Sequence, residues 1–296
     1  MKDYIDIFKS YLLNEKKASS NTVESYLRDI NQFSAYCAAS KINDTAELNS
    51  ESLQKYLEYL TVIGKSDATK SRIVASLRCY YRVLISKSIV TDNPVNSIKV
   101  KKAERKLPGV LDSNEIVLLL SQPDSSDYKG IRDKAMLELL YATGLRVSEL
   151  IDLNIEDVNL QINIVVCHSK NTERIVPIYK SAAKAIENYL ANVRSALVND
   201  RSEKSLFVNM NGTRMTRQGF WKIIKSYADV GGIKKTITPH TIRHSFATHL
   251  LENGAGIKDI KEMLGHSGIS STQVYSQIIK QKYENTYTKF HPKAGN

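Results

Sequence analysis

Residues 142–150 have the sequence Ala-Thr-Gly-Leu-Arg-Val-Ser-Glu-Leu. Gly144 is predicted to end one helix and Arg146 to begin the next, because glycine is favoured just beyond a helix C-terminus. A guanidinium group beside the free amides of a helix N-terminus suits a phosphate group. A lone arginine at a helix start is, however, more often an ordinary surface residue. The stretch therefore predicts a helix boundary and one candidate phosphate site.

The residues on both sides of this stretch predict helices around a small sheet. Ile162, Ile164 and Val166 alternate with other residues, as in a half-buried strand, and residues 174–178 are predicted to return as a second strand. The turn between them is Ser169-Lys170-Asn171-Thr172. Helical spacing of apolar residues occurs at about 113–121, 128–143, 147–152, 181–198, 216–229, 239–252, 257–264 and 270–288.

The first hundred residues predict a bundle of helices. Three helical stripes, the second capped by Ser20 or Asn21, precede a fourth helix at about Asp67 to Ser86. The apolar stripe of this fourth helix consists of Ile73, Leu77, Tyr80 and Leu84. Arg78 and Arg82 are predicted to lie on the opposite, polar face. That face either enters the groove of a nucleic acid or is simply solvated.

Charge points to a polyanionic partner. The 296 residues include 42 Lys and Arg against 31 Asp and Glu, a net charge of +11, which favours nucleic acid although it also serves solubility. The helical half ends near Pro94, because a residue before proline is pushed out of helical geometry. A dense basic segment follows, which contains Lys101, Lys102, Arg105 and Lys106. We predict a domain boundary near 95–110, where these four side chains either bind nucleic acid or form a solvated linker.

Composition excludes several protein classes. With 42% hydrophobic and 25% charged residues, 13 Gly and 6 Pro, the chain is not disordered. Apolar runs such as Ile116 to Leu120 are far shorter than the roughly 18 residues of a membrane span, and Asp3, Asp6 and Lys9 argue against a signal peptide. Three cysteines without CxxC spacing indicate neither a disulfide framework nor zinc. We expect a cytoplasmic protein.

His240 and Arg243 form a second short signal. Thr238 is the expected cap and Pro239 the first residue of their helix. Three residues apart, they share a face of the first turn, where an anion is welcome. The spacing alone is weak evidence, since six histidines occur in the chain.

Three more signals are weak individually. His266, in Gly265-His266-Ser267, follows a predicted helix and could merely complement its dipole. Tyr275 lies nine residues later and, among 16 tyrosines, is by default a packing residue. Lys170 at the hairpin tip could be a solvated turn residue.

The set is far more specific than its members. It comprises, in chain order, Arg146, Lys170, His240, Arg243, His266 and Tyr275. This order resembles the active site of the tyrosine recombinases, the phage-integrase superfamily. The surrounding sequence is similar to that family at residues 142–150, 173–177, 238–249 and 264–267. The resemblance spans essentially the whole chain, and its compact length is most similar to the Xer branch, the cellular enzymes that resolve chromosome dimers.

The resemblance implies a mainly α fold with a small β-sheet. It places a helical core-binding, DNA-binding domain at residues 1–98 and a basic linker at 99–110. The α+β catalytic domain, with a C-terminal interaction helix, then occupies residues 111–296. One departure concerns the hairpin. The family has Gly-Lys-Gly before a longer turn, whereas here Lys170 follows Ser169 and the turn is one residue shorter.

The resemblance also implies a role for each residue of the set. Arg146 and Arg243 would neutralise the charge of a pentavalent phosphate, and His240 and His266 would donate hydrogen bonds to its oxygens. Tyr275 would attack the phosphorus and form a covalent 3′-phosphotyrosyl link, so that joining needs no ATP.

Two further roles complete this chemistry. Lys170 would protonate the 5′-hydroxyl leaving group. Glu149 would orient or balance the arginines, or else form an i,i+3 surface pair with Arg146. Neither metal nor cofactor is expected, because the motifs contain no carboxylate cluster for two metals and no Gly-rich phosphate loop.

The implied partner is double-stranded DNA. The family acts as a tetramer on two duplexes, and the C-terminal segment is exchanged between protomers. The tetramer here is expected to contain either one kind of recombinase or two. A DNA translocase is a further possible partner. Chromosome partition at cell division is the expected role. A minimal mobile-element integrase, a type IB topoisomerase and a catalytically silent DNA-binding accessory protein are the alternatives.

Overall fold

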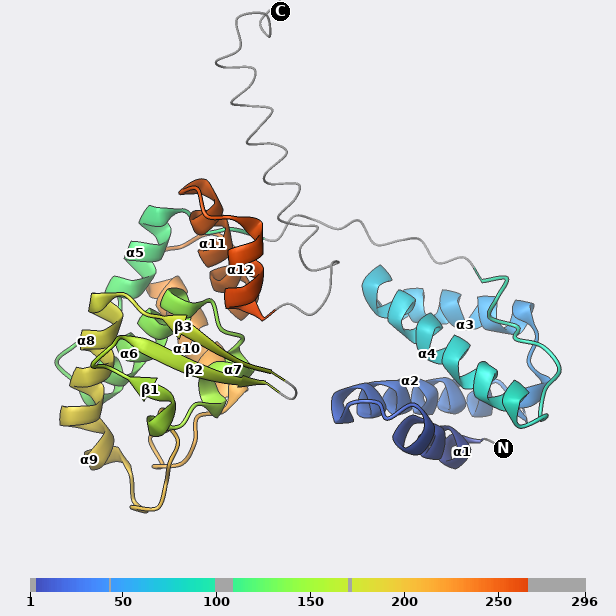
Figure 1. Ribbon diagram of the computed structural model, residues 1–296. Helices are drawn as coiled ribbons and strands as arrows, with labels where there is room; N and C mark the ends of the chain where they lie inside the picture. Colours follow the sequence, from blue (N-terminus) through green and yellow to red (C-terminus); the bar gives the residue numbers. More distant parts are fainter. Residues whose placement is uncertain (1–3, 43, 99–108, 170–171, 266–296) are drawn as a thin grey trace, which may run out of the picture. The chain divides into compact units, whose positions relative to one another are not determined.

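The computed structural model describes residues 4–42, 44–98, 109–169 and 172–265. These residues are mostly helical and include a three-stranded antiparallel sheet, which confirms the predicted fold class. The chain divides into two compact units, residues 1–106 and 107–296 (Figure 1). None of the described helices combines the length and apolarity that a bilayer crossing requires.

The described helices of the N-terminal unit are α1 (Ile5–Ser10), α2 (Ser20–Ala39), α3 (Ser50–Val62) and α4 (Asp67–Ser86), and a π-helical turn, Tyr11–Glu15, continues α1. Helices α2 and α4 pack against each other, and α1 packs against both. All four residues of the predicted apolar stripe of α4 are at most 1% exposed. The predicted bundle therefore exists, and burial of this stripe is a large part of its core.

The start of α2 corrects one prediction. Its N-cap is Ser19, whose backbone is extended and whose hydroxyl accepts a hydrogen bond from the amide of Thr22 at 3.3 Å. Ser20 is already the first helical residue, and Asn21 follows it inside the helix. The prediction that Ser20 or Asn21 caps α2 is therefore wrong. The cap is decided by where the backbone leaves the extended conformation, and three consecutive polar residues do not reveal that point.

Besides the sheet, the C-terminal unit contains eight described helices. They are α5 (Ser113–Ser121), α6 (Tyr128–Thr143), α7 (Val147–Asp152), α8 (Lys180–Tyr189), α9 (Ser195–Leu197), α10 (Arg217–Val230), α11 (Pro239–Glu252) and α12 (Ile257–Leu264). The single helix predicted at 181–198 is interrupted by a π-helical turn at Leu190–Arg194. The helix predicted at 270–288 lies outside the described residues.

The sheet has the strand order β1 (Val158–Asn159), β2 (Ile164–Ser169) and β3 (Thr172–Pro177). Ser169 pairs with Thr172, so the predicted hairpin is confirmed. Ile162, which was predicted to lie in a strand, belongs to the turn before β2 and is 62% exposed. Strand β1 was not predicted, because two residues are too few to show alternation.

Helix α6 is the centre of this unit. It packs against α5, α7, α8, α11 and β3 (Figure 1), and its residues Met136, Leu137, Leu139 and Leu140 are fully buried. A helix covered on most sides provides a rigid base for whatever follows its C-terminus. That C-terminus leads directly into residues 142–150.

Candidate functional site

Arg146 lies where the chain turns from α6 into α7. Gly144 ends α6 in the left-handed conformation, with a φ of +58°, and an added Cβ there would collide with the ring of Phe246. Glycine is therefore required both by the backbone and by the neighbouring helix. Arg146 is the N-cap residue of α7, and its side chain is 40% exposed. The predicted helix boundary is confirmed.

Glu149 lies one turn further along α7 and faces back toward Arg146. Its carboxylate accepts hydrogen bonds from the backbone N–H of Arg146 at 2.8 Å and from its guanidinium at 3.1 Å. The Glu149 side chain is only 9% exposed. The pair has i,i+3 spacing, but Glu149 lies inside the unit and is not a solvated surface residue.

Arg243 reaches the same place from α11. Its guanidinium is 5% exposed and donates hydrogen bonds to the carbonyl oxygens of Gly144 and Leu264, each at 2.6 Å. Its Nη1 also lies 3.8 Å from Oε2 of Glu149. Arg243 therefore connects the end of α6, the end of α12 and the carboxylate of α7.

Arg174 of β3 is a third arginine at Glu149, and no role was predicted for it. Its Nη1 and Nη2 donate to the two carboxylate oxygens at 3.0 and 2.8 Å, and its Nε donates to the carbonyl oxygen of Met263 at 2.8 Å. The sequence contains a usable signal. Arg174 and the buried Val176 are two residues apart in β3 and so share a face, and a buried arginine needs an acidic partner.

We refer to Arg146, Arg174 and Arg243 around Glu149 as the arginine cluster. Burial alone raises the pKa of Glu149, but the hydrogen bonds from Arg174 and from the Arg146 amide, with the charges of both arginines, outweigh burial and hold this pKa below its usual range. Glu149 is therefore ionised at neutral pH. Among the described residues, three guanidinium groups meet at this one carboxylate, so positive charge is concentrated here in a form that can bind an anion.

His240 lies on the first turn of α11, beside the cluster residue Arg243. Thr238 caps this helix as predicted, since its hydroxyl accepts from the Thr241 amide at 3.1 Å. The His240 side chain is exposed. One turn further, burial lowers the pKa of the half-buried His244, and the charges of His240 and Arg243 lower it further. The start of α11 is thus a positive environment with an exposed imidazole.

The other three residues of the predicted set, Lys170, His266 and Tyr275, lie outside the described residues. The chain on either side of them leads to the cluster. Strand β3 begins at Thr172, two residues before Arg174. Gly265 is the left-handed C-cap of α12, with a φ of +62°, and an added Cβ there would lie 2.9 Å from Nη1 of Arg174.

The DNA-binding candidates of the N-terminal half have different surroundings. Arg82 is exposed, as predicted for a polar face. Arg78 is half-buried, and its Nη2 donates to the carbonyl oxygen of Ile98 at 2.9 Å. The chain beyond α4 therefore contacts part of this face at Arg78, and DNA binding by Arg78 stays a prediction. Outside the described residues are Lys101, Lys102, Arg105 and Lys106.

The cysteines lie in the interior, away from any arrangement of metal ligands among the described residues. Cys37, Cys79 and Cys167 are buried and unbridged, and burial raises the pKa of Cys37 and of Cys167 to about 12. Within the described ranges, no group of three or more His, Cys, Asp or Glu side chains could hold a metal ion.

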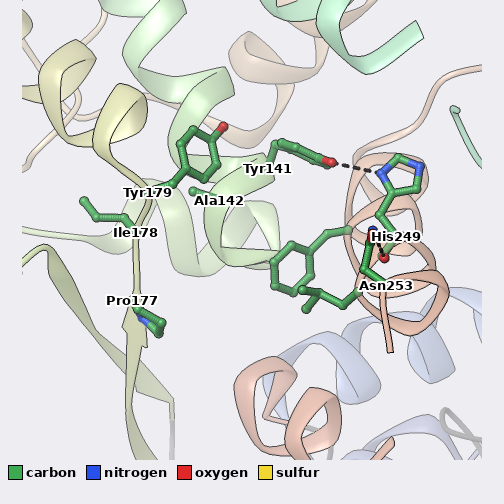
Figure 2. Close-up of a pocket in the computed structure, with 9 residues that line it drawn as sticks. Tyr141, Ala142, Pro177, Ile178, Tyr179, His249 and Asn253 are labelled. Carbon is green, nitrogen blue, oxygen red and sulfur yellow. Dashed lines mark hydrogen bonds between the residues drawn. The ribbon is translucent and has the colours of Figure 1, made fainter. Parts of the chain in front are cut away.

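A cavity of about 450 Å³ lies between the end of α6, the end of β3 and α11 (Figure 2). Its walls are mainly apolar, and Figure 2 shows Tyr141 and His249 joined across one side by a hydrogen bond of 2.9 Å between the hydroxyl and Nδ1. The remaining lining residues are Ala142, Pro177, Ile178, Tyr179, Phe246, Leu250 and Asn253. Phe246 also contacts Gly144, so the cavity and the arginine cluster share part of their framework.

Comparison with known families finds two matches. Residues 109–282 match the phage integrase family, and residues 5–88 match the phage integrase N-terminal SAM-like domain. Tyrosine recombinase XerD of Staphylococcus epidermidis is 41% identical over 295 residues, which are 99% of this chain and all of that protein. Tyrosine recombinase XerD of Oceanobacillus iheyensis is 44% identical over 293 residues, 98% of each chain.

Solved structures agree with this fold. A crystal structure of XerA recombinase is similar with a TM-score of 0.54 and 27% identity, over 99% of this chain and all of that one. The XerH site-specific recombinase bound to a palindromic difH substrate, a post-cleavage complex, gives a TM-score of 0.78 at 21% identity over 96% of this chain and 84% of that one.

Proposed function

We propose, from the premise that the chain belongs to the phage integrase family and is an Xer-like tyrosine site-specific recombinase, that the arginine cluster binds the scissile phosphate of a DNA strand. The observation that carries this proposal is the convergence of three guanidinium groups on the carboxylate of Glu149, with one of them open to solvent. The exposed Arg146 supplies the contact that DNA can reach, and the buried Arg174 and Arg243 maintain its geometry.

The reaction assigned to this site is a phosphoryl transfer in which a phosphotyrosine link conserves the energy of the DNA phosphodiester bond. The phenolic oxygen of Tyr275 attacks the phosphorus, its proton passes to His240 or to solvent, and the bond to the 5′-oxygen breaks. Lys170 gives the 5′-oxygen its proton. Arg146, with hydrogen bonds from His240 and His266, stabilises the charge that builds on the nonbridging oxygens. Attack by a 5′-hydroxyl of another strand reverses each step and joins the strands.

Trapping on a nicked duplex tests this proposal. When the cleaved strand carries a nick a few nucleotides beyond the cleavage site, cleavage releases a short fragment that bears the 5′-hydroxyl. This fragment diffuses away and cannot rejoin, so wild-type protein accumulates as a covalent adduct. Tyr275→Phe is expected to bind the same DNA and form no adduct, because only the nucleophilic oxygen is lost. An adduct that persists in this variant, and moves to Tyr283 or Tyr287 on peptide mapping, overturns the assignment.

The same substrates separate the alternative functions. A silent DNA-binding accessory protein forms no adduct at all. A type IB topoisomerase forms an adduct and relaxes supercoils but does not exchange strands between two duplexes. Selection of bound fragments from the host genome distinguishes chromosome dimer resolution, which requires a site near the replication terminus, from mobile-element integration.

Assembly on DNA is the remaining part of the proposal. We infer a tetramer on two duplexes, with a basic linker at 99–110 between the DNA-binding residues 1–98 and the catalytic residues 111–296, in the cytoplasm. The stripe Ile279, Tyr283, Tyr287 and Phe290 supports exchange of the C-terminal segment between protomers. Removal of residues from Lys280 onward should leave single-site binding unchanged and sharply reduce strand exchange. Recombination at the normal rate would exclude this exchange.

A further inference from the structure

Arg174 connects three elements through one side chain. It is the third residue of β3. Both of its terminal nitrogens bond the carboxylate of Glu149 in α7. Its third nitrogen, Nε, bonds the carbonyl oxygen of Met263 in the last turn of α12. Helix α12 packs against β3 (Figure 1). The guanidinium therefore lies at the point where these three elements meet.

Two arginine side chains hold the end of α12. The last carbonyl groups of a helix have no partners within it and accept bonds from cations. Here Arg174 occupies the carbonyl of Met263 and Arg243 occupies that of Leu264. The next residue, Gly265, lies so close that an added Cβ would be 2.9 Å from Nη1 and 3.1 Å from Cζ of Arg174. Hydrogen bonding and close packing thus both determine where the chain leaves α12.

Arg174 is poorly placed to contact DNA itself. Its side chain is 11% exposed, and three of its nitrogens are already engaged by Glu149 and Met263. Arg146 shares the same carboxylate but is 40% exposed. The two arginines therefore differ in role although they bond the same group.

We propose that Arg174 is a positioning residue, which fixes the end of α12 relative to Arg146 and so determines where His266 and the chain toward Tyr275 begin. The proposal rests on the proposed function of the arginine cluster. Because Glu149 bonds both Arg146 and Arg174, the exposed arginine and the exit of α12 are held through a single carboxylate.

Arg174→Lys is the sharpest variant for testing this role. Lysine keeps the positive charge, but its single ammonium group cannot bond both oxygens of Glu149 and the carbonyl of Met263 at the fixed angles of a guanidinium. The matched control is Arg194→Lys, because Arg194 also donates to two backbone carbonyls, those of Ser205 at 3.0 Å and Glu203 at 2.6 Å, with no bond to Glu149. Both variants keep the charge and lose guanidinium bonds to backbone carbonyls, but only Arg174 also bonds a carboxylate and lies at the exit of α12.

Two measurements on the full-length protein test whether Arg174 positions the end of α12. In the first, amide hydrogen exchange without DNA should rise about tenfold in the peptide covering residues 261–269 of Arg174→Lys, as expected when a charge-assisted hydrogen bond is lost. That peptide should be unchanged in Arg194→Lys. Unchanged exchange there in Arg174→Lys would show that the arginine does not hold the exit of α12. This readout needs no catalysis and remains informative if the proposed function is wrong.

In the second measurement, adduct formation is followed in a single turnover at saturating protein. Arg174→Lys should lose about 10²-fold in rate, the size expected for a misplacement near 1 Å, while its DNA affinity and the rate of Arg194→Lys stay near wild type. A neutral methylphosphonate at the scissile position separates placement from charge neutralisation. The methylphosphonate should restore part of the adduct-formation rate of Arg146→Ala, because less charge needs neutralising. It should leave the reduced rate of Arg174→Lys unchanged. Equal relief of both variants, or a wild-type rate for Arg174→Lys, would overturn the proposal.

Discussion

Two buried carboxylates of the C-terminal unit have opposite surroundings. Asp133 in α6 is fully buried and accepts two hydrogen bonds from Arg132, at 2.9 and 2.7 Å, and one from the hydroxyl of Tyr227 at 3.0 Å. One negative charge faces one positive charge, and both side chains are at most 3% exposed. Glu149, by contrast, faces three arginines, and the outermost of them is 40% exposed.

On the proposed function, the difference separates a pair that serves the fold from a group that serves a ligand. A balanced buried pair has its charges neutralised within the protein, and its removal is felt in stability. A buried surplus of positive charge is unfavourable for folding unless an anion shares it, and such surpluses are typical of functional sites. The comparison predicts that variants of Asp133 change stability and variants of the arginine cluster change cleavage.

The largest expected effect is on the balanced pair. Asp133→Ala leaves the guanidinium of Arg132 buried without its acceptor, and arginine does not release its proton, so the free energy of unfolding should fall by about 3–5 kcal/mol. Urea unfolding measures this loss. The cleavage rate per folded molecule should stay at the wild-type value. A large rate loss in fully folded Asp133→Ala would break the distinction between the two carboxylates.

The next largest effect is expected on the cleavage rate when Arg146, the exposed arginine of the cluster, is replaced. Arg146→Ala should slow single-turnover cleavage about 10²–10³-fold, as expected when one preorganised donor to a developing charge is removed. Stability should change by less than about 1 kcal/mol, because the pair with Glu149 is partly solvated on the arginine side. Cleavage is followed on the nicked duplex and stability by urea unfolding. A stability loss comparable to that of Asp133→Ala would show that Arg146 serves the fold.

Local signals were sufficient to predict most of the framework. The bounds of α4, the cap of α11 and the helix boundary at Gly144 all follow from residues within a few positions of each other. These features depend on capping and apolar spacing, which are properties of the local chain. Arg146 and Arg243 were recognisable as candidates for the same reason, since each lies near a helix start, and their role toward phosphate stays a prediction.

Contacts between distant segments account for what could not be predicted. Arg174 meets Glu149 25 positions earlier and Met263 89 positions later, so its partners became visible only with the fold. Arg78 similarly bonds the carbonyl of Ile98, which lies beyond its own helix. Spacing within an element shows which face a residue occupies, but it does not show which other element covers that face.

The N-terminal unit extends the comparison with a third buried carboxylate. Asp29 is 2% exposed and accepts hydrogen bonds from Arg72 and, at 2.6 Å, from Ser76. Because this pair is balanced, Asp29→Ala should lower the unfolding free energy by about 1–3 kcal/mol and leave cleavage at saturating DNA unchanged. The exposed pair Glu51–Lys55 provides the control, and Glu51→Ala should change neither quantity. A cleavage defect at saturating DNA would place Asp29 with the functional group.

The smallest effect is a difference in pH dependence between the two carboxylates of the C-terminal unit. The arginines hold the pKa of Glu149 below its usual value of 4.5 despite burial, whereas burial raises the pKa of Asp133 above its usual 3.8 even though Arg132 opposes it. The ionised form of Glu149 therefore contributes stability above pH 4.5, which is lost as the pH falls through its lower folded pKa. Asp133 has the opposite sign, and its contribution is lost as the pH rises from 3.8 through its higher folded pKa.

Neutral isosteres make these signs measurable. The stability difference between wild type and Glu149→Gln should grow as the pH rises through the acid range, and that between wild type and Asp133→Asn should shrink. Urea unfolding between about pH 3.5 and 7, the interval in which carboxyl groups titrate in proteins, gives both slopes. Slopes of the same sign would mean that three arginines affect a buried carboxylate no differently from one. The charge surplus would then not distinguish the site of Glu149 from an ordinary buried ion pair.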